Sequence, residues 1–171
     1  MRLKTKEMIL FSLLGATMFI SKLITEVLPN IHLLGLFIVA YTVVFRAKAL
    51  IPIYVFVFMT GIYGGFSFWW IPYLYIWSVL WLMVMLLPRK MPKKIATPIY
   101  MVVSGIFGLS YGVLYAPAQA LLFGYDFEKT LAWIAAGFYF DITHAISNFL
   151  VASLTLPLVT VLKRGMKSIR Q

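Results

Sequence analysis

Three polar side chains share one face of the last long apolar segment of the chain. Asp141, His144 and Asn148 are separated by three and four residues, so on a helix they lie on the same side. A carboxylate beside an imidazole can exchange protons or hold a polar ligand. A charged side chain at mid-bilayer costs about 2.5–3.5 kcal/mol on insertion scales, so we expect Asp141 to face protein or a water-filled cavity.

Two interpretations of this polar stripe remain open. Asp141 and His144 line or support a ligand cavity, or they form an interhelical clamp in which Asp141 holds His144 and a hydroxyl such as that of Ser104 or Tyr111. Their depth in the segment favours the clamp. A third alternative, an intramembrane enzyme with Asp141 and His144 as acid and base, predicts turnover by the purified chain.

Other reactive groups are few. His32 is the only histidine besides His144, and the chain has no cysteine, which excludes disulfides, thiolate metal sites and a cysteine nucleophile. No G-x-x-x-x-G-K-[ST] loop is present to cradle a nucleotide phosphate. We therefore predict no metal site and no enzymatic activity.

Aromatic residues crowd the segment around Gly64 and Gly65. This segment is either an interfacial belt or a lid over a flat, partly apolar ligand, and its aromatic density favours the lid. The candidate ligand-contacting aromatics are Tyr63, Phe66, Phe68, Trp69, Trp70 and Tyr73.

Lys22 and Glu26 lie one turn apart near the end of the first apolar segment, where we expect a simple ion pair that snorkels to the interface.

Small residues form two seams that permit close helix approach. Ser104, Gly108 and Gly112 predict internal packing. The other seam consists of Ser12, Gly15 and Ala16, for which internal packing and an external partner helix are equally compatible with the pattern.

Composition shows which kind of protein must position these groups. Of the 171 residues, 63% are hydrophobic and 12% are charged, whereas soluble domains have about 45–50% apolar and about 25% charged residues. The net charge of +10 sits at the ends of apolar segments, which favours contact with lipid phosphates over nucleic-acid binding. The composition predicts an integral membrane protein whose backbone is satisfied within helices.

Hydropathy and proline positions predict a single all-α domain over residues 1–171. Its six transmembrane helices are expected at about 8–28, 31–45, 49–63, 72–87, 95–122 and 130–163, with a bend at Pro157. All Lys and Arg residues except Lys22 and Lys129 lie before the first segment, at alternate boundaries, or after the last. This positive-inside pattern predicts that both termini are cytoplasmic.

Four features are similar to those of one known family. They are the six predicted helices, the seam of small residues on the first helix, the aromatic loop after the third helix, and the run Gly137-x-x-x-Asp141-x-x-His144-x-x-x-Asn148 on the last. The chain resembles, over essentially its whole length, the substrate-binding S components of energy-coupling factor (ECF) vitamin transporters. The resemblance implies the S-component fold, as in riboflavin-binding S components, and a location in the bacterial plasma membrane.

The resemblance also implies partners and a mechanism. The subunit would bind a vitamin outside the cell and topple in the bilayer on association with a transmembrane coupling protein and two cytoplasmic ATPases. The first-helix seam would contact the coupling protein through Ser12, Gly15 and Ala16, with Ser12 at a position where alanine is commoner. The loops after the first, third and fifth helices would form the site and its gate.

Within the family, the sequence looks closest to the cobalamin-type S components of lactic acid bacteria. Cobalamin would be the transported ligand, with no covalently bound cofactor. Cobalt coordination would fall to His32 or His144, but we expect binding through shape and hydrogen bonds from Asn30, His32, Gln119 and Tyr125. A queuosine precursor is the alternative cargo, and a purely structural membrane subunit is the alternative of another class.

Overall fold

The computed structural model describes residues 3–28 and 31–170, the side chains of 168–170 excepted, and this part of the chain is helical with no strand. The helices are α1 (Thr5–Thr25), α2 (Leu34–Phe45), α3 (Leu50–Gly64), α4 (Tyr73–Met85), α5 (Lys93–Leu109), α6 (Tyr111–Phe123), α7 (Phe127–Val151) and α8 (Thr155–Arg170). Short 3-10 turns lie at η1 (Arg46–Ala49), η2 (Phe68–Trp70) and η3 (Ala152–Leu154).

Within residues 3–28 and 31–170, five helical segments are long and apolar enough to cross a membrane: Thr5–Thr25, Leu34–Gly64, Phe68–Met85, Lys93–Phe123 and Phe127–Lys167. The fold is therefore that of a multi-pass helical membrane protein. The second and third predicted helices fall within one of these segments, so six separate crossings stay a prediction.

The segment Leu34–Gly64 is not one straight helix, because the chain turns sharply at Arg46. This residue has φ 54°, in the left-handed region that non-glycine residues rarely adopt. Two hydrogen bonds hold the turn: Arg46 Nη2 donates to the Met85 carbonyl at 2.8 Å, and Trp81 Nε1 donates to the Arg46 carbonyl at 3.1 Å. Contacts with α4 thus stabilise the strained turn between α2 and α3.

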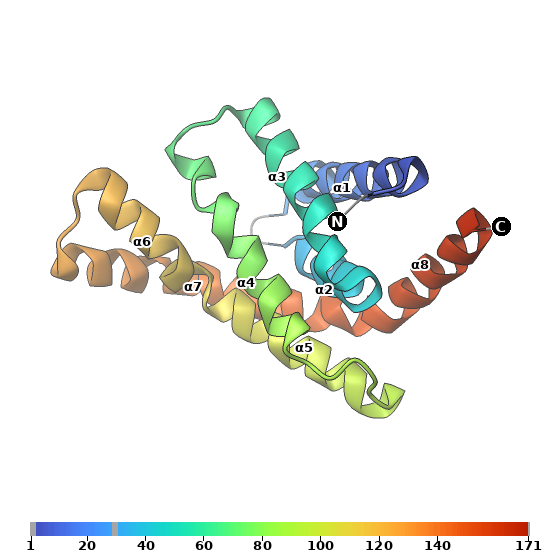
Figure 1. Cartoon of the computed structure of the whole chain (residues 1–171). Helices are drawn as coiled ribbons and strands as arrows, with labels where there is room; N and C mark the ends of the chain where they lie inside the picture. Colours follow the sequence, from blue (N-terminus) through green and yellow to red (C-terminus); the bar gives the residue numbers. More distant parts are fainter. Residues whose placement is uncertain (1–2, 29–30, 171) are drawn as a thin grey trace.

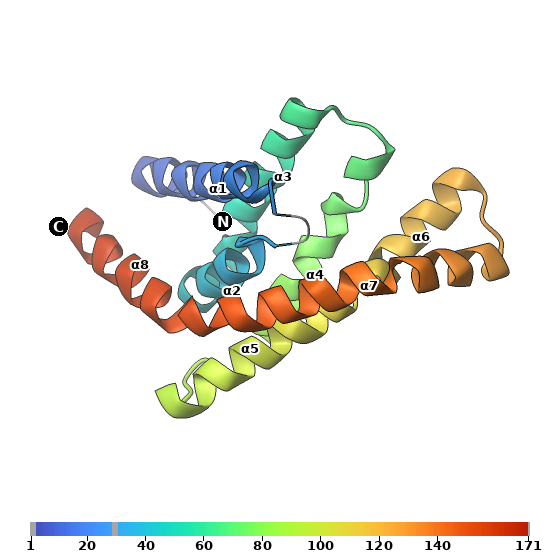
Figure 2. The same cartoon turned by 180° about the vertical axis from the view of Figure 1, so that it is seen from behind.

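The last two predicted helices are each divided in two. The fifth breaks at Ser110, between α5 and α6, and the sixth breaks at η3, between α7 and α8. The bend expected at Pro157 lies just before it, so that Pro157 occupies the first turn of α8, where a missing N–H is tolerated. Figures 1 and 2 show α7 running antiparallel along α5 and α6 as a long hairpin.

The core lies where α2 and α4 pack together and meet α5. Its largest fully buried side chains include Trp77, Tyr41, Phe56, Phe107 and Ile38. On one side, α1 packs along α3. The helix ends that carry most cations lie on the same side of the molecule, to the right in Figure 1: the beginnings of α1 and α5, the turn after α2 and the end of α8.

Candidate functional site

A polar cavity of about 290 Å³ lies where the end of α1 and the segment that follows it meet the beginnings of α4 and α6 and the middle of α7. Its lining combines charged, imidazole and phenol groups. Its lining residues are Lys22, Thr25, Glu26, Leu28, Ile31, His32, Tyr73, Tyr111 and His144.

The two histidines, far apart in the sequence, meet in this cavity. Their ring centroids are 5.3 Å apart, and the His144 ring lies 5.0 Å from that of Tyr111. In both histidines, Nδ1 is buried without a hydrogen-bond partner in the described structure. The pair therefore presents unused hydrogen-bonding groups beside the cavity.

Burial, helped by the neighbouring charges of His144 and Lys22 and opposed by a backbone hydrogen bond, lowers the pKa of His32 from 6.5 to about 4. The imidazole is therefore neutral at physiological pH. It lies between Lys22, Glu26, Tyr73, Tyr111 and His144, so Glu26 supplies the only carboxylate among the described lining residues.

The lowered pKa predicts that the protein loses stability in acid. Between pH 6.5 and pH 4 the unfolded state binds a proton at His32 that the folded state does not, so the free energy of unfolding falls as pH falls, by at most about 3 kcal/mol. Thermal unfolding in detergent at pH 7.5, 6 and 5 measures this. In His32→Gln the unfolding temperature should fall less between pH 7.5 and pH 5 than in the wild type. An equal fall in the variant and the wild type would contradict the prediction.

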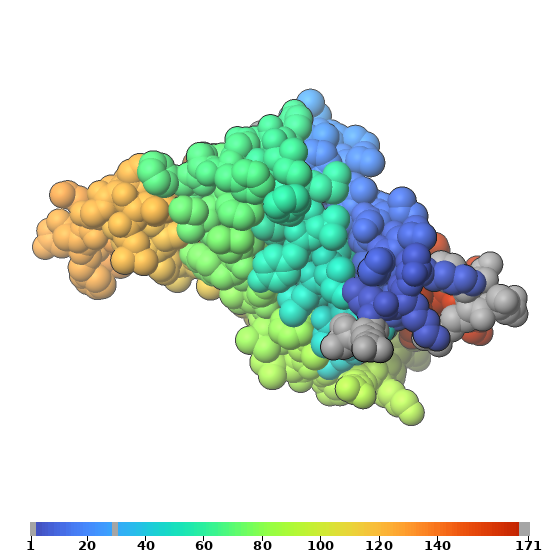
Figure 3. All heavy atoms as spheres, turned by 45° about the horizontal axis from the view of Figure 1, so that its top comes forward, coloured from blue at the N-terminus to red at the C-terminus, as the bar shows by residue number. Residues whose placement is uncertain are grey.

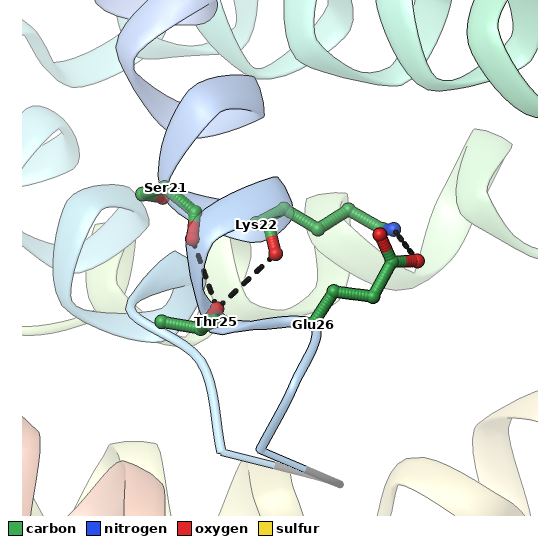
Figure 4. A network of polar contacts seen from close by, with 4 residues as sticks. All are labelled: Ser21, Lys22, Thr25 and Glu26. Carbon is green, nitrogen blue, oxygen red and sulfur yellow. Dashed lines mark hydrogen bonds and ion pairs between the residues drawn. The ribbon is translucent and has the colours of Figure 1, made fainter.

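Lys22 and Glu26 form the predicted ion pair, with Nζ and Oε1 3.4 Å apart at the end of α1 (Figure 4). The hydroxyl of Thr25 donates to the carbonyls of Ser21 at 2.9 Å and Lys22 at 3.3 Å, which ties the last turn of the helix together. The pair is more than a surface contact, because both side chains line the cavity. It offers a cation and a carboxylate to a ligand at the same point.

Asp141 serves the helix packing. Its Oδ1 accepts the backbone N–H of Gly112 at 3.0 Å, in the first turn of α6, where helical N–H groups have no partner of their own. Asp141 thus caps α6 from α7 and stabilises the break after α5. The clamp interpretation therefore needs a correction. Asp141 bonds to Gly112 rather than to the expected partners His144, Ser104 and Tyr111, and the buried hydroxyl of Ser104 has no partner among the described residues.

The aromatic segment packs mainly against its neighbours. Trp70 Nε1 donates to the Val57 carbonyl at 2.8 Å, and the Tyr115 hydroxyl donates to the Trp69 carbonyl at 2.7 Å. The Phe68 ring lies 5.7 Å from that of Phe123, which joins the segment to α6, as the green and gold surfaces of Figure 3 show.

Of the six aromatics predicted to contact ligand, Tyr73 lines the cavity and stacks edge-on against Trp69 at 5.6 Å. Tyr63 instead meets Phe19, and Phe66 meets Trp70.

Two further candidates lie elsewhere. Gln119 is half-buried on α6, and Tyr125 follows α6 with its ring 5.9 Å from that of Phe123. Neither is among the residues that line the cavity. Asn30 lies outside the described residues. Of the predicted site loops, the one after α1 contributes Leu28, Ile31 and His32 to the cavity, and helix ends supply most of the other lining residues.

The seam on α5 packs internally, as predicted. Gly108 faces the α7 backbone, where a Cβ atom would lie 2.7 Å from the Ala145 nitrogen, and Ser104 is fully buried. On α1 the seam divides. Gly15 is buried against Val55 and the Pro52 carbonyl of α3, which removes it from the predicted partner surface, whereas Ser12 is exposed and Ala16 half-buried.

Sequence reasoning missed Lys22, Thr25, Glu26 and Tyr111 as cavity residues. Lys22 and Glu26 carried a signal, since an oppositely charged pair is unusual at the end of an apolar segment. No local pattern indicated Tyr111. Among the described residues, no three His, Cys, Asp or Glu side chains gather as a metal centre.

Comparisons of the chain with protein-family models, with curated proteins and with solved structures find no match.

Proposed function

We propose that the chain is the substrate-binding S component of an ECF-type importer and that the cavity at the end of α1 holds its cargo. The observation that carries this proposal is the position of the cavity along α1. This helix begins beside Lys4 and Lys6 and ends at Lys22 and Glu26. Its 21 residues extend about 30 Å, the thickness of the hydrocarbon core.

Orientation follows from the charges. Cation-rich helix ends face the cytoplasm, so the two termini are inside and the cavity opens outside. Because the turn at Arg46 separates α2 from α3, these two helices cross separately, which makes six crossings. A coupling protein and two ATPases would supply the energy. Ser12 and Ala16 remain available on α1 for the coupling protein.

The cavity volume bears on the cargo. Sites for small ligands occupy about 300–1,000 Å³, and this cavity of about 290 Å³ is at the lower limit. A cobalamin molecule would fit only if the surrounding segments separated. A queuosine precursor, a flat bicyclic heterocycle, fits better: its ring would lie among Tyr73, Tyr111 and His144, and its polar groups would meet Lys22 and Glu26. We therefore place this alternative cargo ahead of cobalamin.

The placement of Asp141 favours a binding subunit over an acid–base enzyme. His144 lines the cavity, while Asp141 accepts the Gly112 N–H at Oδ1 and has no hydrogen-bond partner at Oδ2 among the described residues. The two side chains that the enzyme hypothesis requires to act together thus serve different neighbours.

Calorimetry on the purified chain in detergent tests the cargo, with a queuosine precursor, cobalamin, riboflavin and folate as ligands. We expect tight binding of the queuosine precursor that Glu26→Gln and His144→Phe each weaken by at least about tenfold, because a charged or buried hydrogen-bonding group is lost. The matched control is Glu128→Gln, which removes an exposed carboxylate from the first turn of α7.

The outcomes separate the parts of the proposal. Tight cobalamin binding would keep the transporter and overturn the small cargo. Binding unaffected by Glu26→Gln and His144→Phe would overturn the site. Binding of none of the ligands, or cargo uptake by membranes that lack a coupling protein and ATPases, would overturn the S-component function.

A further inference from the structure

A second groove, with a basic rim and an apolar floor, lies between the end of α2 and the second half of α8. It has a volume of about 270 Å³ and is lined by Val44, Lys163, Met166 and Lys167. Helices α2 and α8 pack against each other, and Figure 2 shows α8 continuing past the bundle from this contact. The groove is therefore separate from the cargo cavity and lies on the cation-rich side.

The lysines of this groove differ from two other cations on the same side. Lys48 is paired with Glu7, with Nζ and Oε1 2.5 Å apart, and Arg46 donates to the Met85 carbonyl. Lys163 and Lys167 form no ion pair with a described residue. Since the α8 sequence contains no acidic residue, their charge is not balanced within the helix.

Spacing makes these two charges a common binding element. Lys163 and Lys167 are one helical turn apart, so both ammonium groups can reach one anion from the same face. Like charges at this spacing destabilise a helix by a few tenths of a kcal/mol, and a bound anion would offset that cost. Val44 and Met166 add apolar surface beside it.

We propose that this groove binds the headgroup phosphate of an anionic phospholipid of the inner leaflet. Lys163 and Lys167 contact the phosphate as compact cations, and Val44 and Met166 contact the glycerol and the first carbons of the acyl chains. The combination of two unbalanced cations with an apolar floor favours a lipid over a free inorganic anion. The site requires only that the chain is a membrane protein, so its test is independent of the cargo.

Native mass spectrometry of the full chain released from micelles containing equal phosphatidylglycerol and phosphatidylcholine tests the proposal. We expect one retained phosphatidylglycerol on the wild type. Lys163→Gln with Lys167→Gln should reduce its retention about tenfold or more, since each lysine near an anionic surface contributes substantially to binding. Lys93→Gln with Lys94→Gln removes the same charge from exposed positions at the beginning of α5 and should change retention less than about twofold.

Two further arms separate a lipid site from charge alone. Met166→Gln keeps every charge and should lower retention several-fold, and inorganic phosphate at equal concentration should not displace the lipid. Equal losses in the two double variants, equal retention of phosphatidylcholine, or displacement by phosphate would each overturn the proposal. Thermal unfolding of every variant shows that the loss is not a loss of fold.

Discussion

Adding a single methyl group at Gly108 is expected to push apart α5 and α7, which pack along each other. A Cβ atom there would lie 2.7 Å from the Ala145 nitrogen and from the His144 carbonyl carbon and oxygen. These are backbone atoms of α7, which cannot rotate aside as a side chain could. Gly108→Ala should therefore lower the free energy of unfolding by about 3 kcal/mol, the upper part of the range for overpacking.

Gly137→Ala on α7 is the matched control for this substitution. A Cβ atom at Gly137 meets nothing within 4 Å, and alanine in a helix is favoured over glycine by about 1 kcal/mol. Unfolding of the two variants in detergent should therefore shift in opposite directions. If Gly108→Ala is as stable as Gly137→Ala, then the α7 backbone does not lie within 3 Å of a Cβ atom at Gly108.

Removing the carboxylate of Asp141 should destabilise the protein more than removing its charge. In Asp141→Ala the Gly112 N–H loses its acceptor inside the protein, which costs about 1–3 kcal/mol. Asp141→Asn keeps an oxygen for that bond and also lowers the cost of a charge within the membrane. We expect the asparagine variant to unfold close to the wild type and to retain ligand affinity.

The same pair of variants distinguishes packing from catalysis. If Asp141 is a helix cap, Asp141→Asn is nearly silent and Asp141→Ala lowers both stability and ligand affinity, because His144 lies one turn away on the same helix. If the chain is an enzyme, Asp141→Asn abolishes turnover by the purified protein while stability is preserved. Equal destabilisation by both variants would show that the negative charge itself is what the fold requires.

Local pattern predicted the all-helical fold well, because a bilayer leaves the backbone few alternatives. The long apolar runs correspond to helices of the structure, and the seam of Ser104, Gly108 and Gly112 packs internally as expected. Glycine explains two of the ends: Gly65 and Gly124 have φ of 84° and 65° after α3 and α6. The breaks at Ser110 and η3 were not predicted, since tertiary contacts stabilise them.

The cargo cavity was predicted less completely, because it depends on contacts between distant segments. Sequence reasoning selected His32, Tyr73 and His144, which do meet there, together with outer aromatics that pack elsewhere. It did not predict that Lys22 and Glu26 join them. The loop after α1 lines the cavity as predicted, through Ile31 and His32, and helix ends supply Lys22, Tyr73 and Tyr111.

Residue types and their order are enough to predict a helical chain that is apolar enough to cross a membrane several times and cationic at alternate segment ends. These properties depend on composition and on local periodicity. The meeting of His32 with His144 and the capping of α6 by Asp141 instead follow from the packing of distant helices. Such pairings depend on how closely helices approach, as Gly35 approaches Asn148 and Gly108 approaches Ala145. The size of the side chains at those crossings sets the geometry of the site, and these side chains come from segments far apart in the chain.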